Sequence, residues 1–261
     1  MVTKLSERIY RTEGIVLRQM ELGEADRILT LYTPQYGKLR AMAKGIRRPA
    51  SKLRGHLELF TRTKLMLARG RNLDVITGAE TIEPFRGLRS EDQAALDLIG
   101  GAYRIAERLD RLTEDGIENR AVWDLLVAAM GALSDGVPPR MIMLHFDLRL
   151  LGYLGYQPNL DTCAGCGNPL EPIENRYSFE LGGVLCPDCR SEDPAAEPLS
   201  VNALKLLRLM ARQDARVVAR LRLPDGLLEE VEGLLNRSVR LTTDRDFAAP
   251  AVLRSLRSED A

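Results

Sequence analysis

The sequence predicts an α+β protein of more than one domain: an N-terminal five-stranded β-barrel, then an α-helical domain that carries a small metal-binding insertion. Three observations predict it. The first 80 residues contain short apolar segments separated by turn residues, the residues beyond Pro84 have helical periodicity, and all four cysteines lie in one irregular stretch. With 261 residues the chain is long enough for two domains, which we place at 1–82 and 83–261.

The strands of the first domain are predicted from β-branched and apolar segments that end at turn residues. Gly14 is a candidate bend or bulge in the first strand, and the stretch from Thr33 to Gly37 supplies turn chemistry after the second. The predicted strands are 8–18, 28–33, 39–43, 57–67 and 73–77. Five strands in about 75 residues suit a small closed barrel, and an OB-fold has this strand count. Periodicity alone leaves an SH3-like barrel open.

Helical periodicity replaces the strand pattern after Pro84. Ser90 and Gln93 have the spacing of a capping box at the start of the first helix. Its predicted apolar stripe is Leu96, Ile99, Tyr103, Ala106 and Leu109. The later helices are predicted at 118–134, after the Pro138–Pro139 pair, at 201–212 behind the N-cap Ser200, and at 227–239 behind the N-cap Asp225.

Basic residues are concentrated in the barrel. The chain has 37 Lys and Arg against 37 Asp and Glu, but the first 80 residues have 16 against 8. From Lys38 to Arg71 there are eleven basic residues and one acid, Glu58. Basic residues without interspersed acids repel one another, so we interpret this surface as a binding site for a polyanion, with nucleic acid as the first candidate. The alternative is a solvated loop whose charges only keep the protein soluble. The candidate phosphate contacts are Lys38, Arg40, Lys44, Arg47, Arg48, Lys52, Arg54, Arg69 and Arg71.

Three aromatic residues of the same domain have two readings. Tyr32, Tyr36 and Phe60 could stack on bases, and each could equally belong to the core. A similar choice applies to His145, which lies in an apolar helical segment and is expected to be a satisfied core histidine.

The four cysteines predict one structural zinc ion. Cys163 and Cys166 form one CxxC pair, Cys186 and Cys189 form a second, and nineteen residues separate the pairs. This is the spacing of a four-cysteine zinc site, in which two intervening residues let both thiolates reach one ion. Four thiolates leave no open position for water or substrate, so the role is structural. The region 158–198 is expected to form a zinc-ribbon-like unit with a hairpin between the pairs. A redox dithiol and an iron–sulfur cluster are the alternatives.

Several classes of protein are excluded by what the sequence lacks. No uncharged apolar run approaches the roughly 18 residues of a membrane span, and the N-terminus has no apolar signal core. We therefore expect a cytoplasmic protein without membrane contact. There is no phosphate loop and no Ser-His-Asp set, so an enzyme is not expected.

Several stretches of the chain resemble the bacterial DNA repair protein RecO family. The N-terminal resemblance lies in TEGIVLR at 12–18, LGEADRIL at 22–29 and AKGIRRP at 43–49, followed by SKLRGHL at 51–57. The LGY at 154–156 and the two CxxC pairs match the zinc-bearing version of the family. The resemblance covers nearly the whole chain in order and is specific in the first 80 residues and at the cysteines.

The resemblance implies an OB-fold followed by a helical domain with the zinc site. It implies binding of single- and double-stranded DNA, annealing of complementary strands, and help to RecA in replacing single-stranded-DNA-binding protein, together with RecR and RecF, at the bacterial nucleoid. The acidic, apolar-ended tail of the coat protein would need a basic-rimmed apolar pocket on the helical domain. Arg140, Arg149 and Arg208 are candidates for its rim, and ordinary solvated arginines are the alternative reading for each. From the charge and cysteines alone, an RNA-binding factor of translation or transcription and a redox enzyme stay open.

Overall fold

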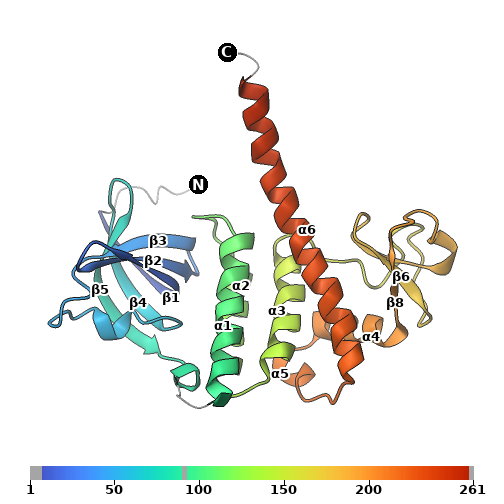
Figure 1. The fold of residues 1–261 in the computed structure, drawn as a ribbon, viewed down its shortest axis with the longest axis horizontal. Helices are drawn as coiled ribbons and strands as arrows, with labels where there is room; N and C mark the ends of the chain where they lie inside the picture. Colours follow the sequence, from blue (N-terminus) through green and yellow to red (C-terminus); the bar gives the residue numbers. More distant parts are fainter. Residues whose placement is uncertain (1–7, 90–92, 259–261) are drawn as a thin grey trace. The chain divides into compact units, whose positions relative to one another are not determined.

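The computed structural model of the chain consists of two compact units, Met1–Pro139 and Arg140–Ala261 (Figure 1). It describes residues 8–89 and 93–258. The first unit holds the barrel and the first two long helices, so it extends well beyond the change from strands to helices after Glu83. The predicted division at residue 82 follows that change of secondary structure and stays a prediction. The predicted cap Ser90 lies outside the described residues.

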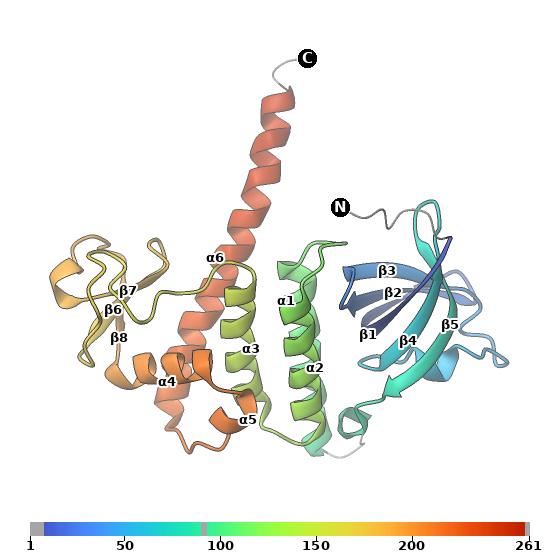
Figure 2. The same cartoon turned by 180° about the vertical axis from the view of Figure 1, so that it is seen from behind.

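Five strands of the first unit form a closed barrel in the order β1-β2-β3-β5-β4, which Figures 1 and 2 show from opposite sides. The pairs are antiparallel except for β3 with β5, which is parallel. The strands are β1 (Ile9–Leu22), β2 (Asp26–Thr33), β3 (Gly37–Ala43), β4 (Arg62–Ala68) and β5 (Asp74–Glu83). The predicted OB-type barrel, followed by helices, is therefore confirmed.

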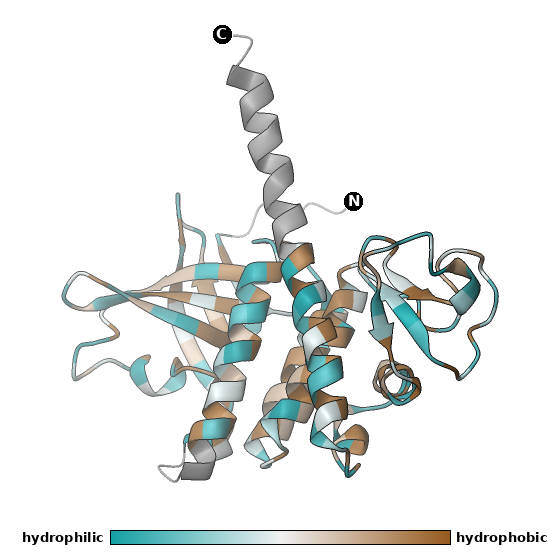
Figure 3. Ribbon diagram, turned by 45° about the vertical axis from the view of Figure 1, so that its right-hand side comes forward, coloured by the Kyte–Doolittle hydropathy of each residue, from teal (hydrophilic) through white to brown (hydrophobic). Residues whose placement is uncertain are grey.

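The barrel interior is filled by apolar side chains, and along β4 the buried side chains alternate with more exposed ones. Figure 3 shows hydrophilic and hydrophobic residues interspersed along the strands of the barrel. The buried cluster consists of Tyr10, Val16, Leu29, Leu31, Ala41, Ala43, Ile46, Leu57, Leu65, Leu67 and Ile76. Gly14 was a candidate bend or bulge in β1, and the bulge is not at this residue. The register shift lies between Val16 and Arg18, so the extra residue is Leu17.

The connection from β3 to β4 also differs from the expectation. The sequence predicts a strand from residue 57, but β4 begins at Arg62 and a short 3-10 helix, η1 (Arg54–His56), lies before it. Leu57 is fully buried in the connection. Phe60 has a φ of 57°, which a strand does not permit, and its N–H donates to the carbonyl of Val16 at 2.8 Å. The apolar alternation thus begins before the start of β4, because the preceding loop itself packs into the core.

Two helices complete the first unit: α1 (Gln93–Leu112) and α2 (Arg120–Ser134), with η2 (Arg86–Arg89) before them. Asn119 caps α2 by accepting the N–H of Val122 at 3.1 Å. The predicted stripe of α1 is only partly correct. Its buried residues are Ala102, Ile105, Ala106, Leu109 and Leu112. Leu96 and Tyr103 are 57% and 51% exposed, because the side of α1 that packs against the core is the one that carries the small residues Ala102 and Ala106.

Four helices belong to the second unit: α3 (Pro139–Tyr153), α4 (Val201–Arg212), α5 (Ala215–Val218) and α6 (Asp225–Ser258). The prediction of α3 behind its proline pair is confirmed. Ser200 caps α4 as predicted, with its Oγ accepting the N–H of Ala203 at 3.1 Å. α6 starts near the predicted residue, at Asp225, but runs well beyond residue 239. No helix among the described residues combines the length and the apolarity needed to cross a membrane.

The cysteine-bearing region of the second unit contains a small sheet. Its strands lie in the order β7-β6-β8 and are antiparallel. They are β6 (Asn175–Ser178), β7 (Gly183–Leu185) and β8 (Glu197–Leu199), with the 3-10 helix η3 (Pro187–Cys189) after β7. The hairpin of β6 and β7 is the one predicted between the two cysteine pairs.

Candidate metal centre and nucleic-acid interface

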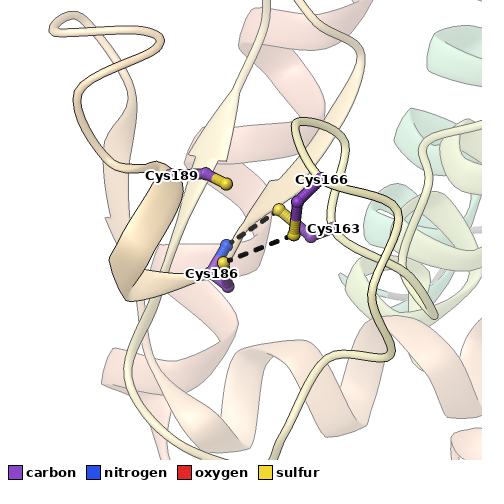
Figure 4. A group of neighbouring side chains, drawn as sticks. All are labelled: Cys163, Cys166, Cys186 and Cys189. Carbon is purple, nitrogen blue, oxygen red and sulfur yellow. Dashed lines mark hydrogen bonds between the residues drawn. The ribbon is translucent and has the colours of Figure 1, made fainter.

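The four cysteines converge on one point, as their spacing predicts. Their sulfur atoms all lie within 4.8 Å of one another, and the Sγ atoms of Cys166 and Cys186 are 3.9 Å apart (Figure 4). Four sulfurs that each lie about 2.3 Å from one ion at tetrahedral angles are about 3.8 Å apart. The cluster therefore has the donor set and the dimensions of a four-thiolate metal site.

Two tight turns aim the sulfurs. In the first, the N–H of Gly167 donates to the carbonyl of Cys163 at 2.9 Å, and Gly167 has a φ of 75° that favours glycine. In the second, the N–H of Cys189 donates to the carbonyl of Cys186 at 3.1 Å within η3. The two turns are joined where the N–H of Ala164 donates to the carbonyl of Val184 in β7. The hairpin thus places one cysteine pair against the other.

The electrostatics of the cluster favour a cation. Burial raises the pKa of Cys163, but the backbone N–H groups of Cys186, Cys166 and Gly165 outweigh it and lower the pKa to about 6. Burial and the neighbouring thiols raise the pKa of Cys189. Thiols this close resist ionising together, since like charges disfavour the charged form. A divalent cation removes that penalty, so the four residues fit a metal ion better than four free thiols.

The basic residues of the barrel are concentrated on the loop between β3 and β4. Lys44, Arg48, Lys52 and Arg54 are all exposed there. Among the described residues, none of these four side chains forms an ion pair; the ion pairs of the barrel involve its other basic side chains. The start of the loop is anchored on the β1–β2 hairpin, where the N–H of Gly45 donates to Asp26 at 2.7 Å. The loop therefore presents four cations on a fixed base.

Three of the candidate phosphate contacts already have acidic partners. Lys38 is 8% exposed, and its ammonium lies 3.4 Å from Asp110 and 3.6 Å from Asp115. Arg40 donates two hydrogen bonds to Asp115, at 2.8 and 3.0 Å. Arg47 forms an ion pair with Glu21 at 3.1 Å. The acids at 110 and 115 were missed in the sequence analysis because they lie more than 70 residues away, and no local signal links them to β3.

The two remaining candidates, Arg69 and Arg71, are exposed on the turn between β4 and β5, and the guanidinium of Arg69 lies over the ring of Tyr10. This turn leads into Asp74 at the start of β5, whereas η1 touches β5 at Thr81 through His56. Seven residues of strand separate these points, or about 23 Å at 3.3 Å per residue. The turn and η1 therefore lie toward opposite ends of β5, while Arg40 lies beside its start, since Ala41 pairs with Asp74.

The aromatic candidates for base stacking are mostly core residues. Tyr32 and Phe60 are 1% and 4% exposed, so neither can stack on a base without rearrangement. Tyr36 is half-buried and its ring lies 4.9 Å from that of Tyr10. The core reading of His145 is confirmed, since it is buried and its Nε2 lies 3.0 Å from the carbonyl of Gln213.

The arginines proposed for an acidic tail lie in the second unit. Arg140 is committed to Glu232 and Asp225, at 3.1 and 3.2 Å. Arg149 lines a cavity of about 220 Å³ with an apolar wall that includes Leu148 and Leu160. A second cavity of about 260 Å³ shares Leu160 with it and is lined by Arg208 and Arg212. The structure thus places Arg149 and Arg208 at neighbouring cavities. Arg208, like Arg140, already has an acidic partner, since it lies 3.5 Å from Asp161.

Comparison with known proteins gives consistent matches. Residues 7–85 match the sequence model for the recombination protein O N terminal, and residues 93–248 match that for the recombination protein O C terminal. A DNA repair protein RecO from Roseiflexus sp. (strain RS-1) is 41% identical over 97% of this chain and 88% of its own length. Relatives of the same name from Dehalococcoides mccartyi and Heliobacterium modesticaldum are both 36% identical, over 96% and 95% of this chain and 97% and 90% of their own lengths.

Proposed function

Because this chain belongs to the recombination protein O (RecO) family of DNA repair proteins, we propose that it is a mediator of recombinational repair that binds DNA and anneals complementary strands. The observation that carries the proposal is the loop between β3 and β4. It presents four exposed cations on an OB-type barrel, and cations without acidic partners are the ones that can replace counterions along a phosphate backbone. Its site of action would be the bacterial nucleoid.

Annealing requires only that two polyanions be brought together. A basic loop lowers the repulsion between the strands, and no bond is made or broken in the process. Within the described part of the chain, the four cysteines are the only group of three or more possible metal ligands that lie together, and a closed four-thiolate site has no position for an attacking water. These features support a mediator without chemistry of its own.

The metal ion of this proposal is one structural zinc per chain, held by Cys163, Cys166, Cys186 and Cys189. The all-sulfur donor set and the tetrahedral dimensions support zinc. Its chemistry there would be structural: coordination would join the two turns and fix the small sheet, which has little core of its own.

The proposed protein partners follow from the family. RecR, RecF and RecA would act with the chain at DNA, and the tail of single-stranded-DNA-binding protein would recruit it. That tail is acidic and ends in apolar residues. The two neighbouring cavities lined by Arg149, Arg208 and Leu160 offer the matching basic and apolar surfaces, which supports them as its site.

Annealing of two dye-labelled complementary oligonucleotides tests the proposal. The purified protein should accelerate annealing without ATP or magnesium, and high salt should suppress it. It should also act on strands coated with single-stranded-DNA-binding protein, and a coat protein lacking its tail should slow only the coated reaction. Strict dependence on ATP, or equal slowing of coated and bare strands, would contradict the proposal. Tighter binding to RNA than to DNA of the same sequence would favour the RNA-binding alternative.

A further inference from the structure

A groove on the outer face of the barrel, distinct from the basic loop, lies between β1–β3 and α1. Two cavities form it, of about 390 and 260 Å³, and they share Arg18, Thr30 and Asp110. All the lining residues belong to the first unit. Since the cavities have lining residues in common, they adjoin each other, and together they cross three strands.

The strands build the floor of the groove by register. Arg18 lies opposite Thr30, which lies opposite Arg40, and this row forms the middle of the floor. The next row contains Met20 and Ile28, of which Met20 is 50% exposed. The bulge in β1 turns Leu17 out of the barrel core and into the groove. An otherwise polar sheet face thus gains an apolar floor.

One wall of the groove is an exposed aromatic residue. Tyr103 of α1 is 51% exposed, and its ring meets that of Phe60 edge-on at 5.0 Å. Phe60 is held under it by a left-handed backbone conformation, which is unfavourable for a phenylalanine and persists because the ring is buried. The tyrosine is therefore a supported ring with one side open to solvent.

The charges of the groove decide between a phosphate and a base as its occupant. Its three cations face carboxylates: Lys38 and Arg18 lie 3.4 and 3.8 Å from Asp110, and Arg40 lies 2.8 Å from Asp115. A further acid of the groove, Glu107, lies 2.6 Å from Arg111. A phosphate would have to displace these carboxylates, whereas the nearby loop offers cations that have no acidic partner among the described residues. A neutral aromatic base meets no such penalty. Every base has a face that stacks on a tyrosine ring, and stacking is insensitive to sequence.

We propose that this groove binds unpaired bases of single-stranded DNA, with Tyr103 as the stacking platform, while the phosphates follow the loop between β3 and β4. The inference rests on the DNA binding proposed above. The two surfaces are continuous, because Met42 lies opposite Ile28 of the floor and Lys44 begins the loop two residues later. Arg18 and Asp110, which face each other at 3.8 Å, could donate to and accept from base edges.

The test compares an oligothymidine with an abasic strand of the same length, using the full-length protein at several salt concentrations. Tyr103→Leu should weaken oligothymidine binding by about fivefold to about 150-fold, the range for one lost base–aromatic stack, and leave the salt slope unchanged. Its binding to the abasic strand should not change. Tyr103→Phe keeps the ring and should bind like the wild type. Met20→Gln, on the other side of the groove, should weaken oligothymidine binding selectively as well.

The matched control is Tyr156→Leu, which removes a 39% exposed tyrosine of the second unit. It should bind both strands normally. If the wild type binds oligothymidine and neither Tyr103→Leu nor Met20→Gln changes that binding, the groove is not a base-binding site. The proposed function would still stand in that case. Failure of the wild type to bind either strand would instead refute the proposed function. A misfolded variant would lose the abasic strand too, so selective loss is the informative result.

Discussion

The salt dependence of DNA binding should follow the cations that lack acidic partners, and not the number of basic residues. We consider the triple variant Arg48→Ala, Lys52→Ala and Arg54→Ala. Each phosphate contact to a single strand contributes about 0.7 to the slope of log affinity against log salt. If the four exposed cations of the loop each bind one phosphate, the wild-type slope is about −2.8 and the variant slope about −0.7.

These slopes separate the two proteins clearly. A roughly fourfold rise in salt should weaken wild-type binding by about fiftyfold and the variant by only about threefold. Fluorescence anisotropy of a labelled oligonucleotide, titrated at several salt concentrations, measures both slopes. The control is a second triple variant with the same charge change: Arg40→Ala, Arg47→Ala and Lys64→Ala. These cations face Asp115, Glu21 and Glu80, at 2.8, 3.1 and 3.9 Å.

Cations that already have carboxylate partners release few counterions when DNA binds, so the control slope should stay close to the wild-type value. Equal loss of slope in the two triple variants would refute this reasoning, because it would show that net charge alone governs binding. An unchanged slope in the loop variant would move the binding surface away from the loop.

Three further predictions concern stability and the metal ion. Cys186→Ser should reduce zinc, measured by elemental analysis, from one equivalent to less than half and destabilise the second unit, while the salt slope of DNA binding stays unchanged. Burial lowers the pKa of His145 below its usual value. The free energy of unfolding should therefore be highest above about pH 6.5 and decrease as the pH falls below it, because the unfolded chain then binds a proton that the folded chain does not. Denaturant titrations at several pH values check this, and His145→Gln should remove that part of the decline. Gly37→Ala should destabilise the protein far more than Gly116→Ala in thermal unfolding: both residues have positive φ, but a Cβ at Gly37 would lie 1.8 Å from the carbonyl oxygen of Ile117, and at Gly116 it meets open space. Similar losses for the two alanines would contradict the clash.

The parts of the fold with a local chemical signature were predictable. Strand alternation and turn residues predict the five-stranded barrel, the Ser200 cap predicts where α4 begins, and the CxxC spacing predicts the sulfur cluster, because each depends on neighbours within a few residues. The buried face of α1 was not predictable in the same way. Tyr103 has helical spacing with the core residues, but the packing of Ala102 and Ala106 turns a different edge inward.

The candidate nucleic-acid site shows the same division. Composition predicts a basic barrel, and the exposed cations of the loop agree with that prediction. Which basic residues are neutralised depends on contacts across the fold: Lys38 meets Asp110 only because α1 returns to β3. The separation of Arg71 from Arg54 likewise depends on the length of β5 and on which residues of β5 the neighbouring segments contact. The distribution of charge along the sequence predicts neither.

The segment that follows α1 has a consequence for how the protein unfolds. Asp115 forms a parallel bridge with Lys38, the N–H of Gly116 donates to the carbonyl of Lys38 at 2.8 Å, and the Lys38 ammonium donates to the carbonyl of Asp110 at 2.6 Å. A fragment that ended after β5 would lose all three contacts and expose the Lys38 ammonium to water. The barrel and α1 should therefore open as one cooperative unit, with amides of β3 and of the end of α1 exchanging hydrogen at a common rate. The smallest part of the chain that folds by itself would then be Met1–Pro139, and not the barrel alone.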